Sequence, residues 1–594
     1  MTSDTERVTA RTTDRAASRA LTGAQAVAQV IARQERPIVY GMPGGYTMHI
    51  YDALFPLGDA VETYLVRQEA LATVMAEAQG RLTGRPAFVV AQGAWVLGNA
   101  GIGIMEAHLG ASPMVVLVDA TDGGSYSHLG PYQAGFGGYG AYDLTAAMRA
   151  ITKQTFVATD PTQALQMTQL AIKHATAGEP GPVAVVFQGR ALFDRIDAGA
   201  QPPSYLERAY TNPRPVLAPD AQIEAAAQAL RSAGRAVLVA GNGVRLARAE
   251  DALLAFAEAV AVPVATTPAG KGTYPEDHPL ALGIIGAFGH DTANSVVGAA
   301  DTVIAVGTKL GATDTANAHP GLLNAARQTF VQIDVEPLNL SWTYPIDHPV
   351  HGDAGDALER LRTALAGWDA QGGDAVAAAR QAHPYHQRAL TSAPGSLNGR
   401  DVITVLSQEL EPDAVVTCDA GENRLFVLRD FQSRAGGTVL QPNGGGGMAY
   451  AIPAAMSAAV NLPGRPVVAV CGDGGMAMTL HGLVSAVELG LTLTVVVLDN
   501  AVLGWVYNGQ RGRTIASTFS PDVDHAAIAA AIGCTAIGVG TVDDLRRAVV
   551  DSRTRAGVTV VVARTTTVDR YQDIMSSLNS HDVYAVPQPE QDGQ

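Results

Sequence analysis

Cysteine and positive charge are scarce in this sequence. Its 594 residues include three cysteines, Cys418, Cys471 and Cys534, and their positions lack the spacing of a disulfide framework or a zinc site. Lys and Arg total 40 against 56 Asp and Glu, so the formal net charge is -16. We find no stripe of basic residues with interleaved aromatics, and therefore do not expect a nucleic-acid partner.

Long apolar runs are also missing. None reaches the roughly 18 residues that span a bilayer, and the opening segment, residues 1–18, mixes Thr, Asp, Arg and Ala without the apolar core of a signal peptide. We therefore expect no membrane association and no export. Because the few cysteines suit a reducing compartment, the expected location is the cytoplasm.

What is present is the composition of a globular, turn-rich protein: 47% hydrophobic residues, 16% charged residues and 63 glycines. Short apolar runs rich in β-branched residues alternate with Ala-rich helical segments such as 24–34 and 71–82, which is the pattern of parallel sheets covered on both faces. In the first third of the chain these runs are 37–40, 87–90, 114–118 and 183–187. The fold class is therefore α/β, with three doubly wound parallel-sheet domains.

Two linkers separate the three domains. One is Pro-rich and the other is an Ala/Gln/Gly stretch that we expect to be weakly structured. In the middle domain we expect four strands, beginning at residues 236, 262, 302 and 329, and in the third domain strands over 414–417, 466–470, 492–498 and 558–563. The expected boundaries are a tail over 1–20, domains over 21–192, 216–366 and 396–578, linkers over 193–215 and 367–395, and a tail over 579–594.

The third domain contains the pattern with the clearest chemistry. An apolar strand ends at Gly472-Asp473-Gly474-Gly475, and residues 476–489 read as a helix behind it. Glycines at this place let the backbone approach an anion, and the helix start offers N–H groups to a phosphate. The next strand ends at Asn500, 27 residues after Asp473, which is one strand-helix-strand crossover. Carboxylate and amide oxygens suit Mg²⁺ bound with a diphosphate.

This arrangement resembles the Gly-Asp-Gly…Asn signature of enzymes that use thiamine diphosphate (ThDP). The resemblance implies that Asp473, Asn500 and the backbone carbonyl of Val502 bind Mg²⁺. It also assigns Leu503 and Gly504, which follow directly, to cofactor binding. The three domains would then be the pyrimidine-binding, central and diphosphate-binding domains of this family.

The first domain extends the resemblance. Val66-Arg-Gln-Glu and the following helix with Thr-Gly-Arg-Pro are similar to the segment of the family that contains the catalytic glutamate, here Glu69. A carboxyl group at the aminopyrimidine of ThDP assists loss of the thiazolium C2 proton. By itself, Glu69 would read as a solvated glutamate near a helix N-terminus. The turn at Gly41-Met-Pro-Gly44 resembles the part of the pyrimidine pocket to which Gly44 belongs.

Two further segments of the third domain resemble the acetolactate synthase and benzoylformate decarboxylase group. In Gly444-Gly-Gly-Gly-Met-Ala-Tyr, the resemblance places Met448 as the apolar wedge under a bent cofactor and the Gly446 carbonyl as an acceptor for its amino group. A methionine in such a setting is otherwise more often part of the core. The turn Gly421-Glu422-Asn423 resembles the diphosphate-contacting turn, although an acidic Glu422 fits there only if its side chain faces away.

The family resemblance also bears on cofactors and assembly. In some relatives the central domain binds FAD, in others ADP and in many nothing; no residue set in this sequence demands FAD, which is left open but not favoured. Each active site of the family joins the first domain of one subunit to the third domain of another. We therefore expect a homodimer at minimum, and a homotetramer as a frequent further state.

The expected reaction is decarboxylation of a 2-oxo acid, pyruvate-like, followed by transfer of the acyl unit to an acceptor, as in the acetolactate synthase-like group. The alternatives are a simple 2-oxo acid decarboxylase, an acyl-CoA lyase or a catalytically silent ThDP-binding subunit. Two features of acetolactate synthases are missing: Tyr139-Gly140-Ala141 replaces Phe-Gln-Glu, and Gly509 stands where Trp is expected. Branched-chain amino-acid synthesis is therefore not the expected role.

Two histidines are candidate acid-base groups, because histidine titrates near neutrality. His128 lies in a Gly- and Tyr-rich loop, and His481 lies just behind the diphosphate turn. The alternatives are a surface-loop histidine and a helix-packing histidine. Arg511 and Arg513 are candidates for binding an anionic substrate, with solvated loop arginines as the alternative.

Overall fold

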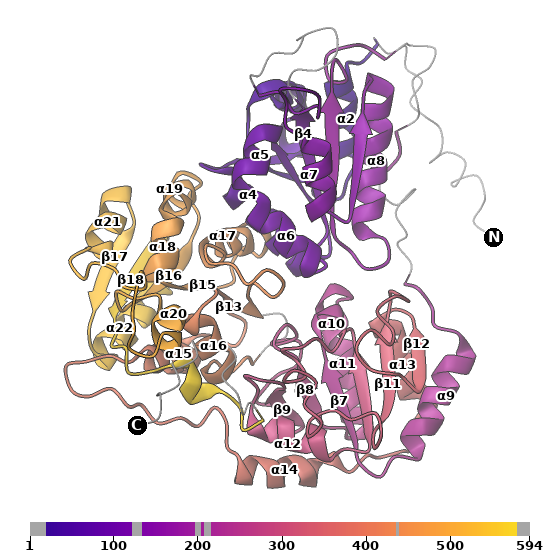
Figure 1. Ribbon diagram of the computed structural model, residues 1–594, viewed down its shortest axis with the longest axis vertical. Coiled ribbons are helices and arrows are strands. Elements are labelled where there is room, and N and C mark those ends of the chain that lie inside the picture. The colour runs from indigo at the N-terminus through magenta and orange to yellow at the C-terminus, as the bar shows by residue number, and fades with distance from the viewer. Residues whose placement is uncertain (1–19, 121–132, 197–203, 207–214, 435–438, 579–594) are drawn as a thin grey trace, which may run out of the picture. The chain divides into compact units, whose positions relative to one another are not determined.

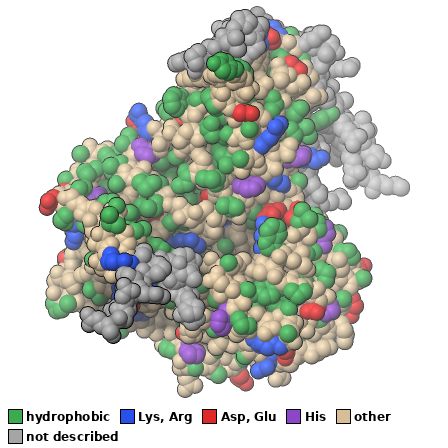
Figure 2. All heavy atoms as spheres, in the orientation of Figure 1, with side chains coloured by type: hydrophobic (Ala, Val, Ile, Leu, Met, Phe, Trp, Pro, Cys, Tyr) green, Lys and Arg blue, Asp and Glu red, His purple; other side chains and the backbone are tan. Residues whose placement is uncertain are grey.

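The structure is a computed structural model that describes residues 20–120, 133–196, 204–206, 215–434 and 439–578 (Figure 1). The chain divides into two compact units, Met1–Arg214 and Pro215–Gln594. Among the described residues, no helix is both long enough and apolar enough to cross a bilayer. On the face drawn in Figure 2, Lys and Arg side chains are dispersed among acidic and uncharged ones.

The first unit contains a six-stranded parallel sheet in the order β2-β1-β3-β4-β6-β5. Its strands are β1 (Ile38–Met42), β2 (Glu62–Leu65), β3 (Ala87–Ala91), β4 (Met114–Ala120), β5 (Gln154–Ala158) and β6 (Pro182–Gln188). Its helices are α2 (Gly23–Ala32), α3 (Met48–Leu54), α4 (Glu69–Thr83), α5 (Gly93–Asn99), α6 (Gly101–Leu109), α7 (Leu144–Ile151) and α8 (Pro161–Thr176), with short 3₁₀ turns η1 (Gly45–Thr47) and η2 (Phe55–Ala60).

The second unit begins with another parallel six-stranded sheet, in the order β12-β11-β10-β7-β8-β9, which is a doubly wound arrangement. Its strands are β7 (Ala236–Ala240), β8 (Val264–Thr266), β9 (Ala281–Ile284), β10 (Thr302–Val306), β11 (Thr329–Asp334) and β12 (His348–His351). The accompanying helices are α9 (Asp220–Arg231), α10 (Asn242–Leu246), α11 (Glu250–Val260), α12 (Asp291–Ala299), α13 (Ala354–Ala364) and α14 (Gly372–Ala382).

The third sheet has the order β14-β13-β15-β16-β18-β17, the same order as the first when strands are counted along each domain. Its strands are β13 (Val415–Cys418), β14 (Val439–Leu440), β15 (Val467–Gly472), β16 (Leu493–Asp499), β17 (Thr535–Val539) and β18 (Val558–Arg564). Its helices are α15 (Gly399–Glu409), α16 (Glu422–Asp430), α17 (Ala451–Asn461), α18 (Asp473–Met478), α19 (Leu480–Glu488), α20 (Gly504–Gly509), α21 (His525–Ile532) and α22 (Val542–Ser552), followed by η4 (Tyr571–Ile574).

The central strands of these sheets are mostly apolar and buried because helices cover both faces. All seven residues of β4 and all seven of β16 are buried. Local signals set the helix starts: Asp160 accepts a hydrogen bond from the Gln163 N–H at the start of α8, where Pro161 occupies the first turn. The α/β fold class with three parallel-sheet domains is therefore confirmed.

The strands that the sequence did not predict are β2, β5, β9, β12, β14 and β17, and each lies at an edge of its sheet. Edge strands are shorter and less apolar than central ones, as the half-exposed pattern of β2 shows. The expectation of a weakly structured second linker is wrong for α14, which is a regular helix and packs against α12. The helix predicted over 476–489 begins at Asp473 and is interrupted at Thr479.

Candidate active site

The site lies at the carboxyl ends of β13, β15 and β16, which are neighbours in the third sheet. Because parallel strands end at one edge, the three loops that follow them meet there. They enclose a cavity of about 810 Å³, which loops of the central domain also line. Its walls include Pro268, Ala269, Phe288, Gly311, Ala312, Thr313, Asp314, Asp419, Gly421, Glu422, Asn423, Arg424, Asn443, Gly446, Met448, Gly472, Asp473, Gly474, Gly475, Asn500, Val502, Leu503, Gly504, Trp505 and Asp569.

The turn after β15 packs closely on one side and is open on the other. A Cβ atom at Gly475 would lie 2.1 Å from Asp419 Oδ2, so only glycine fits there. At Gly472 the nearest atom to such a Cβ is 3.9 Å away, an ordinary van der Waals distance, so this position of the cavity wall is not crowded. Glycines thus bring the backbone close to Asp419 and leave room for a ligand above it.

Asp473 is the buried acid of this turn. Its carboxylate accepts hydrogen bonds from the Gly474 N–H at 2.7 Å and from the Ala501 N–H at 2.7 Å. Burial raises the pKa of Asp473 to about 6, although these two hydrogen bonds act in the opposite direction. A carboxylate that is costly to ionise in this place would be stabilised by a cation bound beside it.

The segment after β16 brings two more oxygen-bearing groups to the same place. Asn500 and Val502 both line the cavity, and Asn500 Oδ1 accepts a 3.2 Å hydrogen bond from the Val502 N–H. Between them, Ala501 has φ of 56°, a left-handed conformation that turns the chain sharply. Among the described residues, no group of three or more His, Cys, Asp or Glu side chains could hold a metal ion. A cation here would therefore need amide and carbonyl oxygens.

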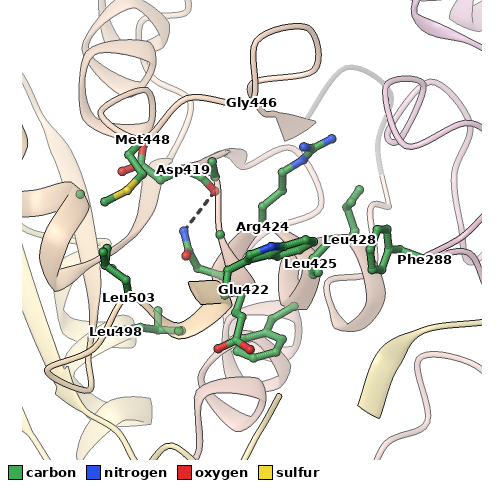
Figure 3. A pocket seen from close by; sticks show the side chains of 18 of the residues that line it. Phe288, Asp419, Glu422, Arg424, Leu425, Leu428, Gly446, Met448, Leu498 and Leu503 are labelled. Carbon is green, nitrogen blue, oxygen red and sulfur yellow. Dashed lines mark hydrogen bonds between the residues drawn. The ribbon is translucent and has the colours of Figure 1, made fainter. Parts of the chain in front are cut away.

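Asp419 holds the glycine-rich loop beside the turn. Its carboxylate accepts hydrogen bonds from the backbone N–H groups of Ala449, Tyr450 and Ala451 at 3.2, 2.7 and 2.6 Å. Its backbone carbonyl accepts a 3.1 Å hydrogen bond from Asn423 Nδ2, the dashed line in Figure 3. Burial raises the pKa of Asp419 to about 6. The loop after β14 is thereby fixed against the start of α16.

Met448 and its neighbours form an apolar part of the wall. Met448 Cε would lie 3.1 Å from a Cβ at Gly474, so the methionine packs against the turn after β15. Gly446, at φ of 63°, has no heavy atom within 4 Å of a Cβ position. Leu503 and Gly504 begin the other wall, where Figure 3 shows Leu503 on the Met448 side of the cavity.

Glu422 points away from Met448 (Figure 3) and packs against Gly504, where a Cβ atom would lie 2.2 Å from Glu422 Oε2. Its carboxylate accepts hydrogen bonds from Asn508 Nδ2 at 2.7 Å and from the Tyr571 N–H at 2.9 Å. Burial raises the pKa of Glu422 to about 7. The side chain thus ties the start of α16 to α20 and η4.

Comparison with known proteins finds one family in three separate parts of the chain. The thiamine pyrophosphate enzyme family, whose cofactor is ThDP, matches in three parts: its N-terminal TPP binding domain over residues 21–136, its central domain over 223–361 and its C-terminal TPP binding domain over 419–563. Each match falls on one of the three sheets.

Relatives across most of the length bear acetolactate synthase names. The acetolactate synthase isozyme 3 large subunit of Escherichia coli is 30% identical over 519 residues, which cover 84% of this chain and 87% of the relative. The chain belongs to the thiamine pyrophosphate enzyme family. The large subunit of Corynebacterium glutamicum is 29% identical, covering 87% and 82%, and a probable large subunit of Methanocaldococcus jannaschii is 28% identical, covering 82% of each chain. This ThDP enzyme is therefore of the acetolactate synthase-like group.

The predicted residues Gly44 and Glu69 lie in the first unit of this ThDP enzyme. Glu69 is the first residue of α4, and its side chain is buried. Asn99 Nδ2 donates a 3.1 Å hydrogen bond to Glu69 Oε2. Gly44 precedes η1, and a Cβ there would stand 3.1 Å from Gln92 Oε1. Glu69 is thus not the solvated glutamate that was the alternative.

The structure gives less support to the two predicted histidines and the two predicted arginines. His128 lies outside the described residues. His481 is half-buried at the start of α19 and is not one of the residues that line the cavity; burial lowers its pKa. Arg511 and Arg513 are exposed and do not line the cavity either.

Sequence reasoning missed several residues of the wall, among them Arg424, Asn443 and Asp314. Arg424 and Asn443 flank segments that were singled out for other residues, and Asp314 lies in a loop whose conformation the sequence did not indicate. The signal for Arg424 was its place directly after the turn at Gly421. No pattern pointed to Asp314, because a loop of the central domain brings it to the third domain.

Proposed function

We propose that this enzyme binds ThDP with Mg²⁺, decarboxylates a 2-oxo acid and transfers the acyl unit to an acceptor. The main observation behind this proposal is that one cavity is lined by the glycine turn after β15, by Asp473 and Asn500, and by the apolar side chain of Met448. The names of the relatives support the acyl-transferring reaction. Neither comparison favours a simple decarboxylase, an acyl-CoA lyase or a silent subunit.

The residues present fit a diphosphate held through a divalent cation. Asp473, Asn500 and the Val502 carbonyl are oxygen donors of the kind that Mg²⁺ prefers, and the phosphates would supply the rest. Gly472, Gly474 and Gly475 would let the backbone of the turn approach a phosphate beside the start of α18. When bound, ThDP supplies a thiazolium carbon that attacks the substrate carbonyl and accepts the electrons released by decarboxylation.

The remaining cofactor contacts in this proposal come from the loops around the turn. Gly421, Glu422 and Asn423 would line the diphosphate through their backbone and the Asn423 amide, since the Glu422 carboxylate is bonded to Asn508 and Tyr571. The other residues proposed to contact ThDP are Gly44, Gly446, Met448, Leu503 and Gly504.

Glu69 is the proposed proton-exchanging residue. Its buried carboxyl, positioned by Asn99, would hold a proton at the aminopyrimidine nitrogen of ThDP. His128 and His481 stay candidates for protonating a later intermediate, with no support from the cavity lining for His481. Apolar residues such as Met448 and Leu503 would exclude water from the reacting carbon.

The test combines the apoprotein with ThDP, Mg²⁺ and pyruvate, with and without acceptor aldehydes, and measures CO₂, acetaldehyde and acyloin products. Ligated product is the expected result; acetaldehyde alone would indicate a decarboxylase and sink the transferase proposal. Asp473→Asn should raise the Mg²⁺ concentration for half-maximal ThDP binding by at least about tenfold, since it removes one charged oxygen ligand. Arg547→Gln, at an exposed position of α22, serves as the control.

The proposal extends to assembly and location. A homodimer is the minimum proposed unit, with a homotetramer as a further state, in the cytoplasm. Small-molecule oxo acids and acceptors are the proposed partners. FAD is not proposed; denaturing the purified protein and assaying released flavin would decide the matter, and stoichiometric flavin would overturn this part.

A further inference from the structure

Among the described residues that line the cavity, Arg424 is the one Lys, Arg or His side chain. It lies in the first turn of α16, directly after the Gly421–Asn423 turn. Figure 3 shows its guanidinium projecting away from Met448 and Leu503, so it occupies a different part of the cavity from the proposed thiazolium wall. This basic group has no role in the function proposed above.

The guanidinium is held in place by a second residue. Arg424 Nε donates a 2.7 Å hydrogen bond to Gln441 Oε1. The Gln441 side chain is buried, and its Nε2 donates to the backbone carbonyl of Pro268 in the central domain. An arginine fixed in this way loses less conformational entropy on binding an anion than a free side chain would.

The position of Arg424 runs against local helix preference. The first turn of a helix is the positive end of the helix dipole, where a cation is disfavoured and an anion is favoured. Residues that break a local rule in a wall of a cavity are expected where function requires them. An oxyanion bound beside Arg424 would be attracted by both the guanidinium and the start of α16.

Asn443 is an independent observation at the same place. It lines the cavity two residues along the chain from Gln441, and both its Oδ1 and its Nδ2 are buried without a hydrogen-bond partner among the described residues. Leaving a buried amide unsatisfied is costly, so such a group indicates a missing ligand. Its N–H₂ group could donate to an oxyanion and its oxygen could accept from a neighbouring hydroxyl.

Asp314 is the acid of this part of the cavity and acts against an anion. Burial raises its pKa to about 6, while the charge of Arg424 and a hydrogen bond from the Gly311 backbone lower it. Asp314 lines the cavity from the loop after β10. Its removal should therefore strengthen any anion binding that Arg424 provides.

We propose that Arg424 and Asn443 form a substrate subsite for an oxyanion, a carboxylate above all, that is separate from the carboxylate lost as CO₂ and is kept in the product. The preferred donor or acceptor would then be a dicarboxylate or another substrate with a distal anionic group. This inference rests on the proposed function for the identity of the substrate, but the binding site itself can be tested without turnover.

The binding test uses glutarate and pentanoate, which share a five-carbon chain and differ by one carboxylate. Calorimetric titration of the ThDP- and Mg²⁺-loaded enzyme should show tighter binding of glutarate. Arg424→Gln should weaken glutarate about 10- to 100-fold, the loss of a charge-assisted hydrogen bond, and leave pentanoate unchanged. Arg547→Gln removes an equal charge at an exposed position of α22 and should leave the affinities for glutarate and pentanoate unchanged.

Asp314→Asn removes a negative charge from the same part of the cavity, and it can test the subsite even if Arg424→Gln does not fold. This variant should bind glutarate more tightly than the wild type and bind pentanoate with unchanged affinity. Equal affinity of the wild type for both probes, or an Asp314→Asn variant that binds glutarate no more tightly, would overturn the subsite. ADP is titrated in the same way. If Arg424→Gln binds ADP more weakly but binds glutarate as the wild type does, Arg424 recognises a nucleotide phosphate, and the carboxylate subsite is overturned.

Kinetics then connect the subsite to the reaction. Arg424→Gln should raise the KM for 2-oxoglutarate about 10- to 100-fold while kcat and KM for pyruvate stay unchanged, a split that a merely structural role would not produce. If no 2-oxo acid releases CO₂, the proposed function fails, and the glutarate titration still decides the subsite.

Discussion

At the residue scale, the carboxyl groups of this protein differ in what surrounds them. Glu69 is buried against a single amide, Asn99. Glu422 is buried beneath two donors, the Asn508 amide and the Tyr571 N–H. Each belongs to a segment expected to contact the cofactor, yet Glu69 is proposed to react and Glu422 to position its neighbours. Their substitutions should separate these roles.

Glu69→Gln should slow exchange of the thiazolium C2 proton of bound ThDP by about 100-fold or more, because the amide cannot hold the exchanging proton. ThDP affinity should change little, since Gln retains the shape of the side chain. Deuterium exchange followed by NMR after acid quench measures the rate. An unchanged exchange rate would remove Glu69 from the mechanism.

Glu422→Gln should change stability in a pH-dependent way. Burial raises the pKa of Glu422 in the folded protein from the ordinary 4.5 to about 7. As pH rises, the Glu422 carboxyl therefore loses its proton at a lower pH in the unfolded chain than in the folded protein. Wild-type stability from Glu422 is therefore fully present below pH 4.5 and falls by up to roughly 3 kcal/mol through pH 7. Urea unfolding of the apoprotein at pH 5 and pH 8 should show the variant relatively more stable at pH 8. A difference independent of pH would contradict this.

At the scale of elements, the turn after β15 connects a strand, a helix start and the loop that Asp419 holds. A methyl group at Gly475 would lie 2.1 Å from Asp419 Oδ2 and would displace a carboxylate that accepts three backbone hydrogen bonds. The turn and the Gly444–Met448 loop therefore depend on one another.

Gly475→Ala should lower the stability of the apoprotein by about 1–3 kcal/mol and weaken ThDP binding, since overpacking must shift Asp419 or the turn. Thermal unfolding and titration of Trp fluorescence with ThDP measure the two effects. Gly538→Ala on β17 is the matched control, because no heavy atom lies within 4 Å of its Cβ position. Equal behaviour of the two variants would show that the turn tolerates the side chain.

The elements also show what the sequence could and could not predict. Central strands such as β15 and β16 were predictable because continuous apolar runs reflect burial on both faces. The turn at Asp473 followed from the same runs, since it is local to one crossover. Edge strands such as β2 were missed because their residues are half exposed. Arg424 and Asn443 were missed because their surroundings come from residues distant along the chain, among them Pro268.

At the scale of the whole molecule, the central domain is joined to the third domain through a buried ionic cluster. Lys271 Nζ lies 2.7 Å from both carboxylate oxygens of Glu276, and His386 Nε2 lies 3.2 Å from Glu276 Oε2. The Ser433 N–H donates to the same carboxylate at 2.8 Å. Burial alone would raise the pKa of Glu276, but the charges of Lys271 and His386 hold it well below its usual range.

Glu276→Gln should destabilise the protein by about 3–5 kcal/mol, because it leaves the buried Lys271 without its counter-charge. The double variant Lys271→Met, Glu276→Leu should recover much of this loss. Since the folded pKa of Glu276 is depressed, its contribution is present above pH 4.5 and is lost as pH falls through lower values. Urea unfolding at pH 7 and at several pH values below 4.5 measures both effects; a double variant less stable than the single one would contradict the account.

Mixed dimers test the proposed assembly. Glu69→Gln and Asp473→Asn subunits should each be inactive alone. If each site joins the first domain of one subunit to the third domain of another, a mixed dimer has one intact site, and random mixing should restore about one quarter of wild-type activity. Co-expression with two affinity tags isolates the mixed dimer. No activity in that purified species would place each complete site within one chain.

The cavity walls differ in how they are built. On one side, the proposed cofactor contacts come largely from glycines and main-chain groups of the third sheet; on the other, the loops at Pro268–Ala269, Phe288 and Gly311–Asp314 belong to the central domain. Those loops can accept replacement without altering the strand ends that would hold the diphosphate. The architecture thus permits substrate preference to diverge, by evolution or by design, while the reactive group is inherited unchanged.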